Sequence, residues 1–249
     1  RCHTLGTMSE ITAAPALDHA EFELLGERLV ILADLALWWP DRRTLVITDT
    51  HFGKTAAFRS HGVGVPETTT MHDLARLTRL IEFTKATRLL HLGDLVHSAE
   101  GCTEAVMDQL AGWRHEHDSL EILLVEGNHD RRAGDLPRCL AIERLQSLNE
   151  GSFRFVHDPT QPEDSGRCLV GGHIHPAVRM HAGKRSERLK CFLASQSRVL
   201  LPAFGSFTGA MTVKPTTNDR VFVAHGNEIC EVGVPSPCID TEARSDRSK

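Results

Sequence analysis

Tyrosine is absent from the 249 residues, and aromatic residues together make up only 5% of the chain. So few rings argue against a long stacking platform of the kind that single-strand-binding proteins use. The net charge of −5 excludes a globally basic nucleic-acid binder, so any affinity for phosphate must be local. The longest apolar stretch, 29–39, contains Asp34 and is too short to span a bilayer.

The seven cysteines are scattered along the chain and include no Cys-x-x-Cys pair. An odd, scattered set argues against a disulfide framework and a zinc finger, and it favours a reducing compartment. The amino end also lacks the basic-then-apolar pattern of a secretory signal. We therefore expect a cytoplasmic protein that does not associate with a membrane.

Apolar runs and amphipathic patterns alternate in the first half of the chain, which predicts parallel βαβ units. The runs at 45–48, 88–92 and 121–125 are separated by helical patterns at 67–85 and 103–115. The second half has short apolar runs with few helical patterns between them, which favours antiparallel strands. We predict an α/β fold: a four-layer αββα sandwich of two mixed β-sheets flanked by helices. One domain over 19–232 is expected between flexible segments at 1–18 and 233–249.

Five clusters of metal-ligand residues follow the predicted strands. They are Asp49-x-His51, Gly93-Asp94-x-x-His97, Gly127-Asn128-His129-Asp130, His157, and Gly172-His173-Ile174-His175. In α/β sheets ligands bind at the carboxyl ends of strands, so these side chains are expected to converge. Asp49 and His51 point to the same side of an extended chain, about 6.6 Å apart, and His173 and His175 repeat that spacing. Two such pairs can bracket two metal ions about 3.5–4 Å apart, with Asp94 placing one carboxylate oxygen on each.

The ligand set combines carboxylate, imidazole and amide without thiolate. Such ligands suit Mn²⁺, Fe²⁺ or Zn²⁺, and affinity alone does not choose among them. Taken singly, each residue has an ordinary explanation as a turn former or a core histidine; their joint order favours the metal site. His157 has no second ligand beside it, so a surface histidine before Asp158-Pro159 is a stronger alternative there.

The order of the five clusters resembles the calcineurin-like metallophosphoesterase superfamily, over about half of the chain. The resemblance implies one metal held by Asp49, His51 and His175, a second held by Asn128, His157 and His173, and Asp94 bridging them. It makes His129 the group that contacts the phosphate and protonates the leaving oxygen. His97 is expected to orient His129 or to touch substrate, and a plain supporting role is the alternative. Asp130 is expected to be a turn or helix-start carboxylate.

Further motifs are similar to the bacterial DNA-ligase-associated metallophosphoesterases. They are Asp34-Leu35-Ala36-Leu37-Trp38-Trp39-Pro40, His51-Phe52-Gly53-Lys54, His157-Asp158-Pro159 and Leu201-Pro202-Ala203-Phe204-Gly205. This resemblance implies a manganese-dependent phosphodiesterase and DNA endonuclease that acts in DNA repair with a DNA ligase and a helicase, and it suggests a homodimer. The protein-phosphatase branch has an acid, Arg and Gly after its Gly-Asp motif, and His97-Ser98-Ala99 departs from that pattern.

The leading hypothesis is hydrolysis of phosphodiester bonds, with single-stranded DNA as the substrate. Lys54, Arg59 and Arg131 lie just past ligand clusters and are candidate phosphate contacts, with solvated surface cations as the alternative. The basic run 184–190 is either a nucleic-acid contact or a soluble hairpin tip. His91, inside an apolar run, is expected to be a satisfied core residue.

Other functions fit the same ligands. A small-molecule nucleotide phosphodiesterase or phosphomonoesterase would differ only at the entrance to the site. A non-catalytic repair scaffold would keep its metals for folding alone, and a single-zinc structural protein is the remaining alternative. Turnover and metal stoichiometry separate these classes.

Overall fold

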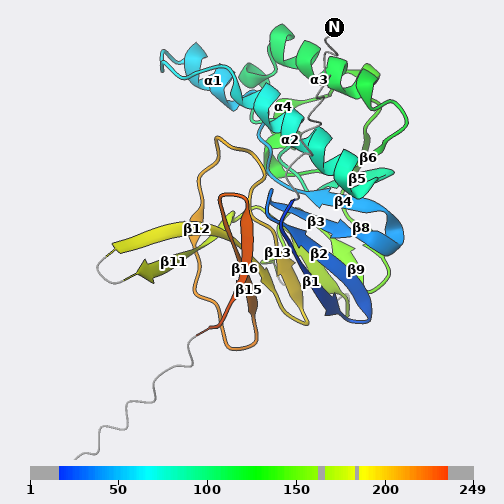
Figure 1. The fold of residues 1–249 in the computed structure, drawn as a ribbon. Helices are drawn as coiled ribbons and strands as arrows, with labels where there is room; N and C mark the ends of the chain where they lie inside the picture. Colours follow the sequence, from blue (N-terminus) through cyan, green and yellow to red (C-terminus); the bar gives the residue numbers. More distant parts are fainter. Residues whose placement is uncertain (1–16, 162–165, 183–184, 235–249) are drawn as a thin grey trace, which may run out of the picture.

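The computed structural model describes residues 17–161, 166–182 and 185–234. The segments 1–18 and 233–249, expected to be flexible, therefore lie almost wholly outside the described residues. Two mixed sheets of seven and nine strands pack face to face, and α-helices cover the first of them (Figure 1). The predicted α/β fold with two mixed sheets is confirmed.

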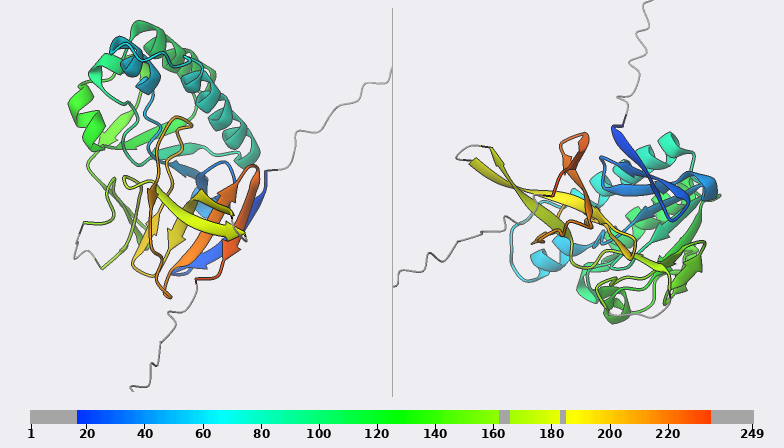
Figure 2. Two further views of the ribbon diagram at one scale, coloured as in Figure 1. Left: turned by 90° about the vertical axis from the view of Figure 1, so that its left-hand side faces the viewer. Right: turned by 90° about the horizontal axis from the view of Figure 1, so that it is seen from below.

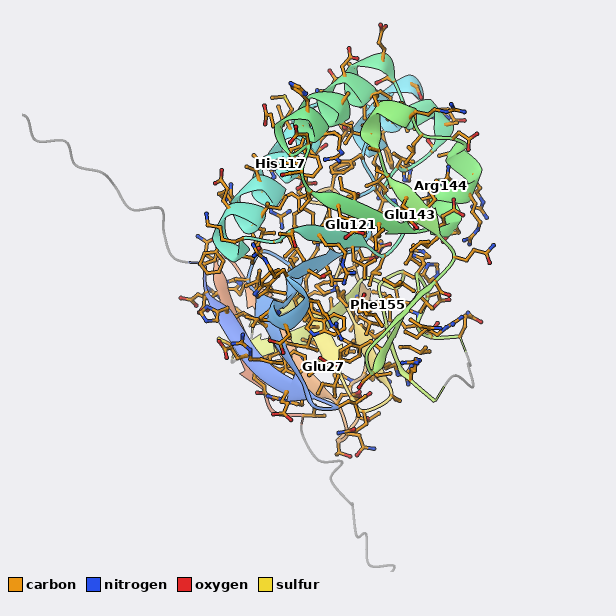
Figure 3. The ribbon with its side chains drawn as sticks, turned by 90° about the vertical axis from the view of Figure 1, so that its right-hand side faces the viewer. Glu27, His117, Glu121, Glu143, Arg144 and Phe155 are labelled. Atoms are coloured by element: carbon orange, nitrogen blue, oxygen red, sulfur yellow. The ribbon has the colours of Figure 1, made fainter. Side chains whose placement is uncertain are left out.

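The first sheet changes from antiparallel to parallel along its width. Its strands, in spatial order, are β1 (His19–Leu24), β2 (Glu27–Leu32), β3 (Ala36–Trp39), β4 (Thr44–Ile47), β5 (Arg88–His91), β6 (Glu121–Val125) and β7 (Glu143–Leu145). β1 to β4 pair antiparallel, and β4 to β7 pair parallel. Figure 3 shows Glu121 and Glu143 on the neighbouring strands β6 and β7, below the helices.

Helices form the crossovers that parallel strands require, because such strands cannot be joined by a tight hairpin. α2 (Thr69–Thr84) and α3 (Glu104–Glu116) confirm the two predicted helices, and Thr103 Oγ1 accepts a hydrogen bond from Val106 N at the start of α3. The sequence did not indicate the short helix α1 (Lys54–Ser60), and it indicated α4 (Asn128–Ala133) only through the helix-start alternative for Asp130; neither helix has apolar periodicity. Single 3₁₀ turns are η1 (Pro40–Arg42), η2 (Ala99–Gly101) and η3 (Arg138–Leu140).

The second sheet is antiparallel at its hairpins and parallel at its centre. Its main path runs β14 (Met211–Thr212), β11 (Pro176–Ala182), β12 (Arg185–Ala194), β13 (Arg198–Leu200), β10 (Cys168–Gly171), β9 (Phe153–Phe155) and β8 (Leu148–Glu150), with β15 (Arg220–His225) and β16 (Glu228–Val232) joined to β12. The prediction of a mostly antiparallel half is confirmed, because five of the eight strand pairs among the described residues are antiparallel. The parallel pairs join β10 to β9 and to β13, and β11 to β14. Periodicity reveals a strand but not the direction of its partner.

The core lies between the two sheets and continues under the helices. In β2, Leu29 and Ile31 pack toward the second sheet, whereas Val30 and Leu32 pack toward α2, as the period of two requires. Trp39 meets Phe153 edge-on, with ring centroids 5.3 Å apart. Phe155 lies on the same inner surface (Figure 3). Each such buried side chain stabilises the fold by roughly 1.5–3 kcal/mol.

The four α-helices of the described residues all lie between positions 54 and 133, so the helical layer is on one side of the molecule (Figure 2). Within the described ranges, the outer face of the second sheet packs against coil residues such as Val213 and Val234. Hairpins join most strands of that sheet, and hairpins need no crossover helix. No helix of the described chain is long and apolar enough to cross a membrane.

Candidate metal centre

The expected ligand residues lie just beyond the carboxyl ends of parallel strands from both sheets. Asp49 is two residues past β4, and Asp94 and Asn128 are three residues past β5 and β6. In the second sheet, His157 and His173 are each two residues past β9 and β10. The parallel centre of the second sheet therefore aims its loops at those of the first.

The backbone is sharply bent where it presents ligands. Asp49, His51, Asp94, His173 and His175 all have positive φ, between 48° and 66°. A left-handed residue other than glycine costs roughly 1–2 kcal/mol, and such strain gathers at functional sites.

Close packing between the loops also requires glycine at Gly172. A Cβ atom there would lie 2.2 Å from Asp49 Oδ2, closer than any side chain permits. The neighbouring amide, His173 N, donates to the same oxygen at 3.0 Å. Gly172 thus lets the second sheet's loop reach the first carboxylate.

The two carboxylate oxygens of Asp49 differ in their hydrogen bonding to the described residues. Its Oδ2 accepts hydrogen bonds from Thr48 Oγ1 and His173 N. Its Oδ1 is buried and accepts no hydrogen bond of good geometry from the described residues, although His175 Nε2 lies 3.2 Å away. Burial raises the pKa of Asp49, but the nearby His175 and His157 imidazoles and the hydrogen bond from Thr48 together lower it to about 2. A buried, ionised oxygen that faces imidazole nitrogens fits a metal ligand.

Asp94 faces two imidazole groups with a single oxygen. Its Oδ1 accepts a hydrogen bond from His129 N at 2.8 Å. Its Oδ2 lies 3.8 Å from His51 Nε2 and 3.5 Å from His157 Nε2. Oδ2 therefore faces both imidazole groups, and the expected arrangement with one oxygen on each ion stays a prediction.

Two groups of ligand atoms converge around this carboxylate. Of three such groups among the described residues, two contain the expected carboxylates: Asp49, His51 and His175 form one, and Asp94, His157 and His173 form another. Within each group the atoms lie within 4.8 Å of one another. Asn128 Oδ1 is 3.2 Å from His157 Nε2 and so lies beside the second group. Burial lowers the pKa of His51 to about 2, which leaves its imidazole neutral at neutral pH. Charge, geometry and donor chemistry fit two divalent cations.

Outer hydrogen bonds orient these imidazoles. His157 Nδ1–H donates to Leu92 O at 2.9 Å, and His175 Nδ1–H donates to Gly209 O at 3.1 Å. Each bond fixes the tautomer and leaves Nε2 unprotonated and pointed at the carboxylates. The sequence alone did not identify either carbonyl as a hydrogen-bond partner of a ligand histidine.

His97 and His129 form a stacked pair beside His51. The ring centroids of His97 and His129 are 5.0 Å apart and their planes differ by 22°. His129 Nδ1–H donates to the carbonyl oxygen of His97, so Nε2 of His129 faces Asp94 Oδ2 at 4.0 Å. The His129 side chain is 29% exposed and that of His51 only 4%. This geometry favours an orienting role for His97, and it leaves His129 accessible to substrate.

The predicted phosphate-binding cations do not all lie at the centre. Lys54 begins α1, and its positive charge adds to burial in lowering the pKa values of His51 and His97. Arg59 forms an exposed ion pair with Glu67, and the Arg131 guanidinium donates to Glu126 O. The described contacts therefore bring Lys54 to the site and engage the other two elsewhere.

Lys190 corrects the interpretation of the basic run 184–190, whose residue 184 lies outside the described chain. Its ammonium is largely buried and donates to Ala203 O at 2.8 Å, Gly205 O at 3.2 Å and Thr208 Oγ1 at 3.3 Å. Burial lowers the pKa of Lys190 to about 8. This residue fixes the segment 201–210 instead of facing solvent. The position of a lysine among the apolar residues of a strand was the sequence feature that could have indicated its burial.

Asp130 is the helix-start carboxylate of α4, one of the two roles expected from the sequence, and it also binds two ligand loops together. It is 2% exposed and accepts hydrogen bonds from four backbone amides. Oδ2 accepts from Asp94 N and Gly127 N, and Oδ1 accepts from Leu95 N and Val96 N. The carboxylate therefore sets the distance between the loop after β5 and the loop after β6.

Replacing Asp130 with asparagine is expected to lower the free energy of unfolding by about 2–4 kcal/mol, because buried amides lose charge-assisted partners. Metal affinity is expected to fall about 10–100-fold, as for other residues that support ligands. Urea denaturation and titration calorimetry measure the two effects. Asp135→Asn is the control, since Asp135 is fully exposed. Equal stability and metal affinity in both variants would show that Asp130 does not hold the loops.

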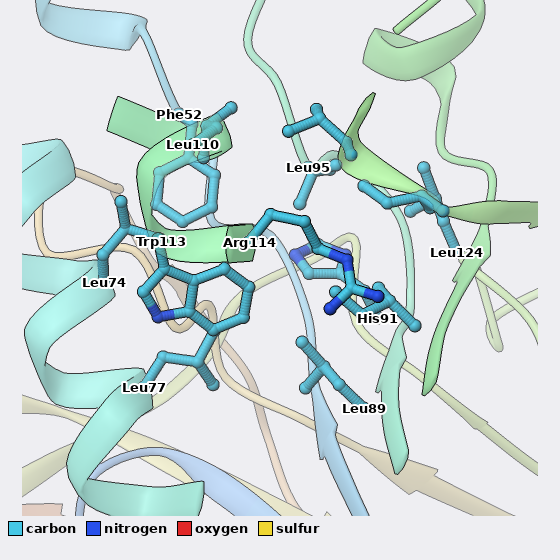
Figure 4. A pocket seen from close by; sticks show the side chains of 13 residues that line it. Phe52, Leu74, Leu77, Leu89, His91, Leu95, Leu110, Trp113, Arg114 and Leu124 are labelled. Carbon is cyan, nitrogen blue, oxygen red and sulfur yellow. The ribbon is translucent and has the colours of Figure 1, made fainter. Parts of the chain in front are cut away.

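A small apolar cavity lies between α2, α3 and the first sheet, behind the centre (Figure 4). Its volume of about 30 Å³ is too small for a substrate. His91 lines it; its Nε2 bonds to Thr50 Oγ1 at 3.0 Å, but its buried Nδ1 has no hydrogen-bond partner among the described residues. His91 is thus a core residue that is only half satisfied, and it supports Thr50 between two ligands.

Comparison with known proteins agrees with this geometry. The family model for calcineurin-like phosphoesterases matches residues 42–228, a span that includes every ligand residue above. The chain belongs to this family. Members use dinuclear divalent metals, and the chain is a hydrolase that acts on phosphoric ester bonds. No curated protein matches it.

Solved structures extend the comparison. This phosphoesterase is similar to the Pseudomonas putida nuclease MPE, with 34% identity over 83% of this chain and 97% of that one, and a TM-score of 0.74. The Escherichia coli phosphoesterase Yfce matches over 77% of this chain and 99% of that one, at 16% identity with a TM-score of 0.36. Of these two structures, the P. putida nuclease is the one whose sequence identity and TM-score are high enough to support a functional comparison.

Proposed function

We propose that this phosphoesterase binds two divalent cations, with Mn²⁺ as the working ion, and hydrolyses phosphodiester bonds in single-stranded DNA. The observation that carries the proposal is the position of Asp94 Oδ2 between two groups of imidazole ligands. The similarity to a nuclease, at 34% identity over most of both chains, supports nucleic acid as the substrate class. Asp49, His51 and His175 would hold one ion, Asn128, His157 and His173 would hold the other, and Asp94 would serve both.

The side chains around the centre have separate tasks in this mechanism. When bound, the two cations supply Lewis-acid polarisation of the phosphate and an activated water nucleophile. Asp49 and Asp94 bring negative charge that balances the cations, and the buried imidazoles exclude bulk water. His129, held through Nδ1–H by the His97 carbonyl, presents Nε2 to the leaving oxygen; as an imidazolium it gives the Nε2 proton to that oxygen and becomes the neutral Nδ1–H imidazole. His97 acts as a positioning residue for that ring.

Charge beside the centre favours a nucleic-acid strand. The β11–β12 hairpin begins directly after His175 and extends away from the body of the protein (Figure 1). It carries the exposed residues Arg179, Arg185 and Arg188, and Arg179 pairs with Arg188 in register across the hairpin. Arginines in this arrangement can bind successive phosphates of one strand.

A role in DNA repair with a DNA ligase and a helicase stays a prediction from the sequence resemblance. The homodimeric state stays a prediction on the same ground.

Removal of metal with a chelator is expected to abolish hydrolysis, and Mn²⁺ is expected to restore it better than Mg²⁺ or Zn²⁺. Rates are measured on a single-stranded DNA oligomer, a cyclic nucleotide and a phosphomonoester. The proposal expects the highest kcat/KM on the oligomer. Faster turnover of either small molecule would identify a nucleotide phosphodiesterase or phosphomonoesterase, and metal binding without turnover would identify a scaffold.

A further inference from the structure

Two phenylalanine rings are exposed beside the metal centre and contact each other. Phe58 on α1 is 37% exposed, and Phe207, in the segment 201–210 between β13 and β14, is 39% exposed. Their ring centroids are 5.8 Å apart with an interplanar angle of 87°. Of the ten phenylalanines, seven are buried, and the only other exposed ring is Phe83. Exposed aromatic rings that come from two distant segments and meet at a site indicate a binding surface.

The ring pair is linked to the metal ligands by a short series of aromatic contacts. The Phe58 ring lies 6.4 Å from the His97 ring, measured between centroids. His97 in turn stacks on His129 and lies 5.5 Å from the ring of His51. One residue therefore separates Phe58 from both the proposed proton donor and a proposed metal ligand.

Both rings are carried on restrained backbone. α1 begins three residues after His51, and Lys54 N donates to His51 O. On the other side, Gly205 N donates to Asp49 O, and Ser206 N donates to Asp73 Oδ2. Lys190 holds the carbonyls of the same segment. The pair is thus positioned relative to the centre before any ligand arrives, which lowers the entropy lost on binding.

A cation accompanies the rings. Lys54 Nζ lies 6.0 Å from the centroid of the Phe207 ring. An aromatic surface next to a single positive charge matches the two parts of a nucleotide, a planar base and a phosphate. This match favours a nucleotide unit over an aliphatic ligand, which would need no cation.

We infer that Phe58 and Phe207 form a stacking site for an unpaired nucleobase next to the phosphate that is cleaved, with Lys54 contacting a neighbouring phosphate. The inference rests on the proposed function and specifies its substrate as a strand with unpaired bases. Every base has a π face, so such a site tolerates any sequence, whereas a base stacked and paired in a duplex cannot enter it. Two rings make a short site, in keeping with the low aromatic content of the chain.

The test uses single-stranded oligonucleotides with one cleavable phosphodiester, flanked either by a normal nucleoside or by an abasic residue. Loss of the base is expected to lower kcat/KM of the Mn²⁺-loaded wild-type protein about 10- to 100-fold, the range for one stacked base. In the double variant Phe58→Ala/Phe207→Ala, the ratio of kcat/KM on the normal oligonucleotide to kcat/KM on the abasic one is expected to fall close to one. Phe83→Ala on α2, an equally exposed phenylalanine, should keep the wild-type ratio. An undiminished base effect in the double variant overturns the inference.

A binding measurement separates this inference from the proposed function. A non-cleavable oligonucleotide that contains 2-aminopurine is titrated with the Mn²⁺-loaded protein, and quenching of its fluorescence reports stacking. Quenching by wild type and by Phe83→Ala, and its loss in the double variant with unchanged circular dichroism, supports the stacking site. Equal quenching by all variants overturns it. If wild type quenches the probe but cleaves no oligonucleotide, the proposed function fails while the stacking site stands.

Discussion

Replacing Asp94 with asparagine is expected to lower phosphodiester hydrolysis at least about 100-fold and to reduce the bound metal below two ions per chain. Asp94 Oδ2 faces both imidazole groups, and asparagine removes its negative charge while keeping its size. Loss of one partner from a buried charge pair costs about 3–5 kcal/mol, which corresponds to 100-fold or more. Mass spectrometry of the metal content and rates on a bis-aryl phosphate diester measure the two effects.

Asp108→Asn provides the matched control for this prediction, since Asp108 is an exposed carboxylate on α3. It is expected to keep two ions and the wild-type rate. Two ions per chain in Asp94→Asn would mean that the other residues hold both metals without it, and the shared role of Asp94 would be wrong.

Replacing His129 with alanine is expected to lower kcat for DNA about 10²–10⁴-fold, the usual contribution of a general acid, with both metals retained. The His129 ring is partly exposed, and its amide, not its ring, bonds to Asp94, so its removal leaves the ligand loops in place. The loss should be smaller for a nitrophenyl diester, because that leaving group needs little protonation. Single-turnover rates on both substrates give the comparison.

His115→Ala, which removes an exposed histidine on α3, controls for the loss of an imidazole elsewhere. Its rates should equal those of the wild type. Should His129→Ala cleave DNA at the wild-type kcat, the proton must come from another group. An equal loss on both substrates would instead mean that the ring binds the phosphate and donates no proton.

The sequence predicted the elements that local pattern determines. Strand β6 has the expected bounds, and the ligand loops follow the expected strand ends. These features depend on apolar runs and on polar residues next to them, both of which are local.

The remainder depends on contacts between distant residues. The pairing direction of β9, β10 and β13 arises from the arrangement of the whole sheet, and no run of residues encodes it. Asp130 resembles an ordinary turn residue until the loop after β5 is placed against it. In the same way, Phe58 and Phe207 are unremarkable in sequence and meet only because α1 and the segment 201–210 flank the same centre.

Anomalous diffraction at the manganese edge, on crystals grown with Mn²⁺, tests the central claim most directly. We expect two peaks per chain, one between Asp49, His51 and His175 and one between Asn128, His157 and His173, with Asp94 contacting both. A single peak, or peaks away from these residues, would contradict the two-metal centre.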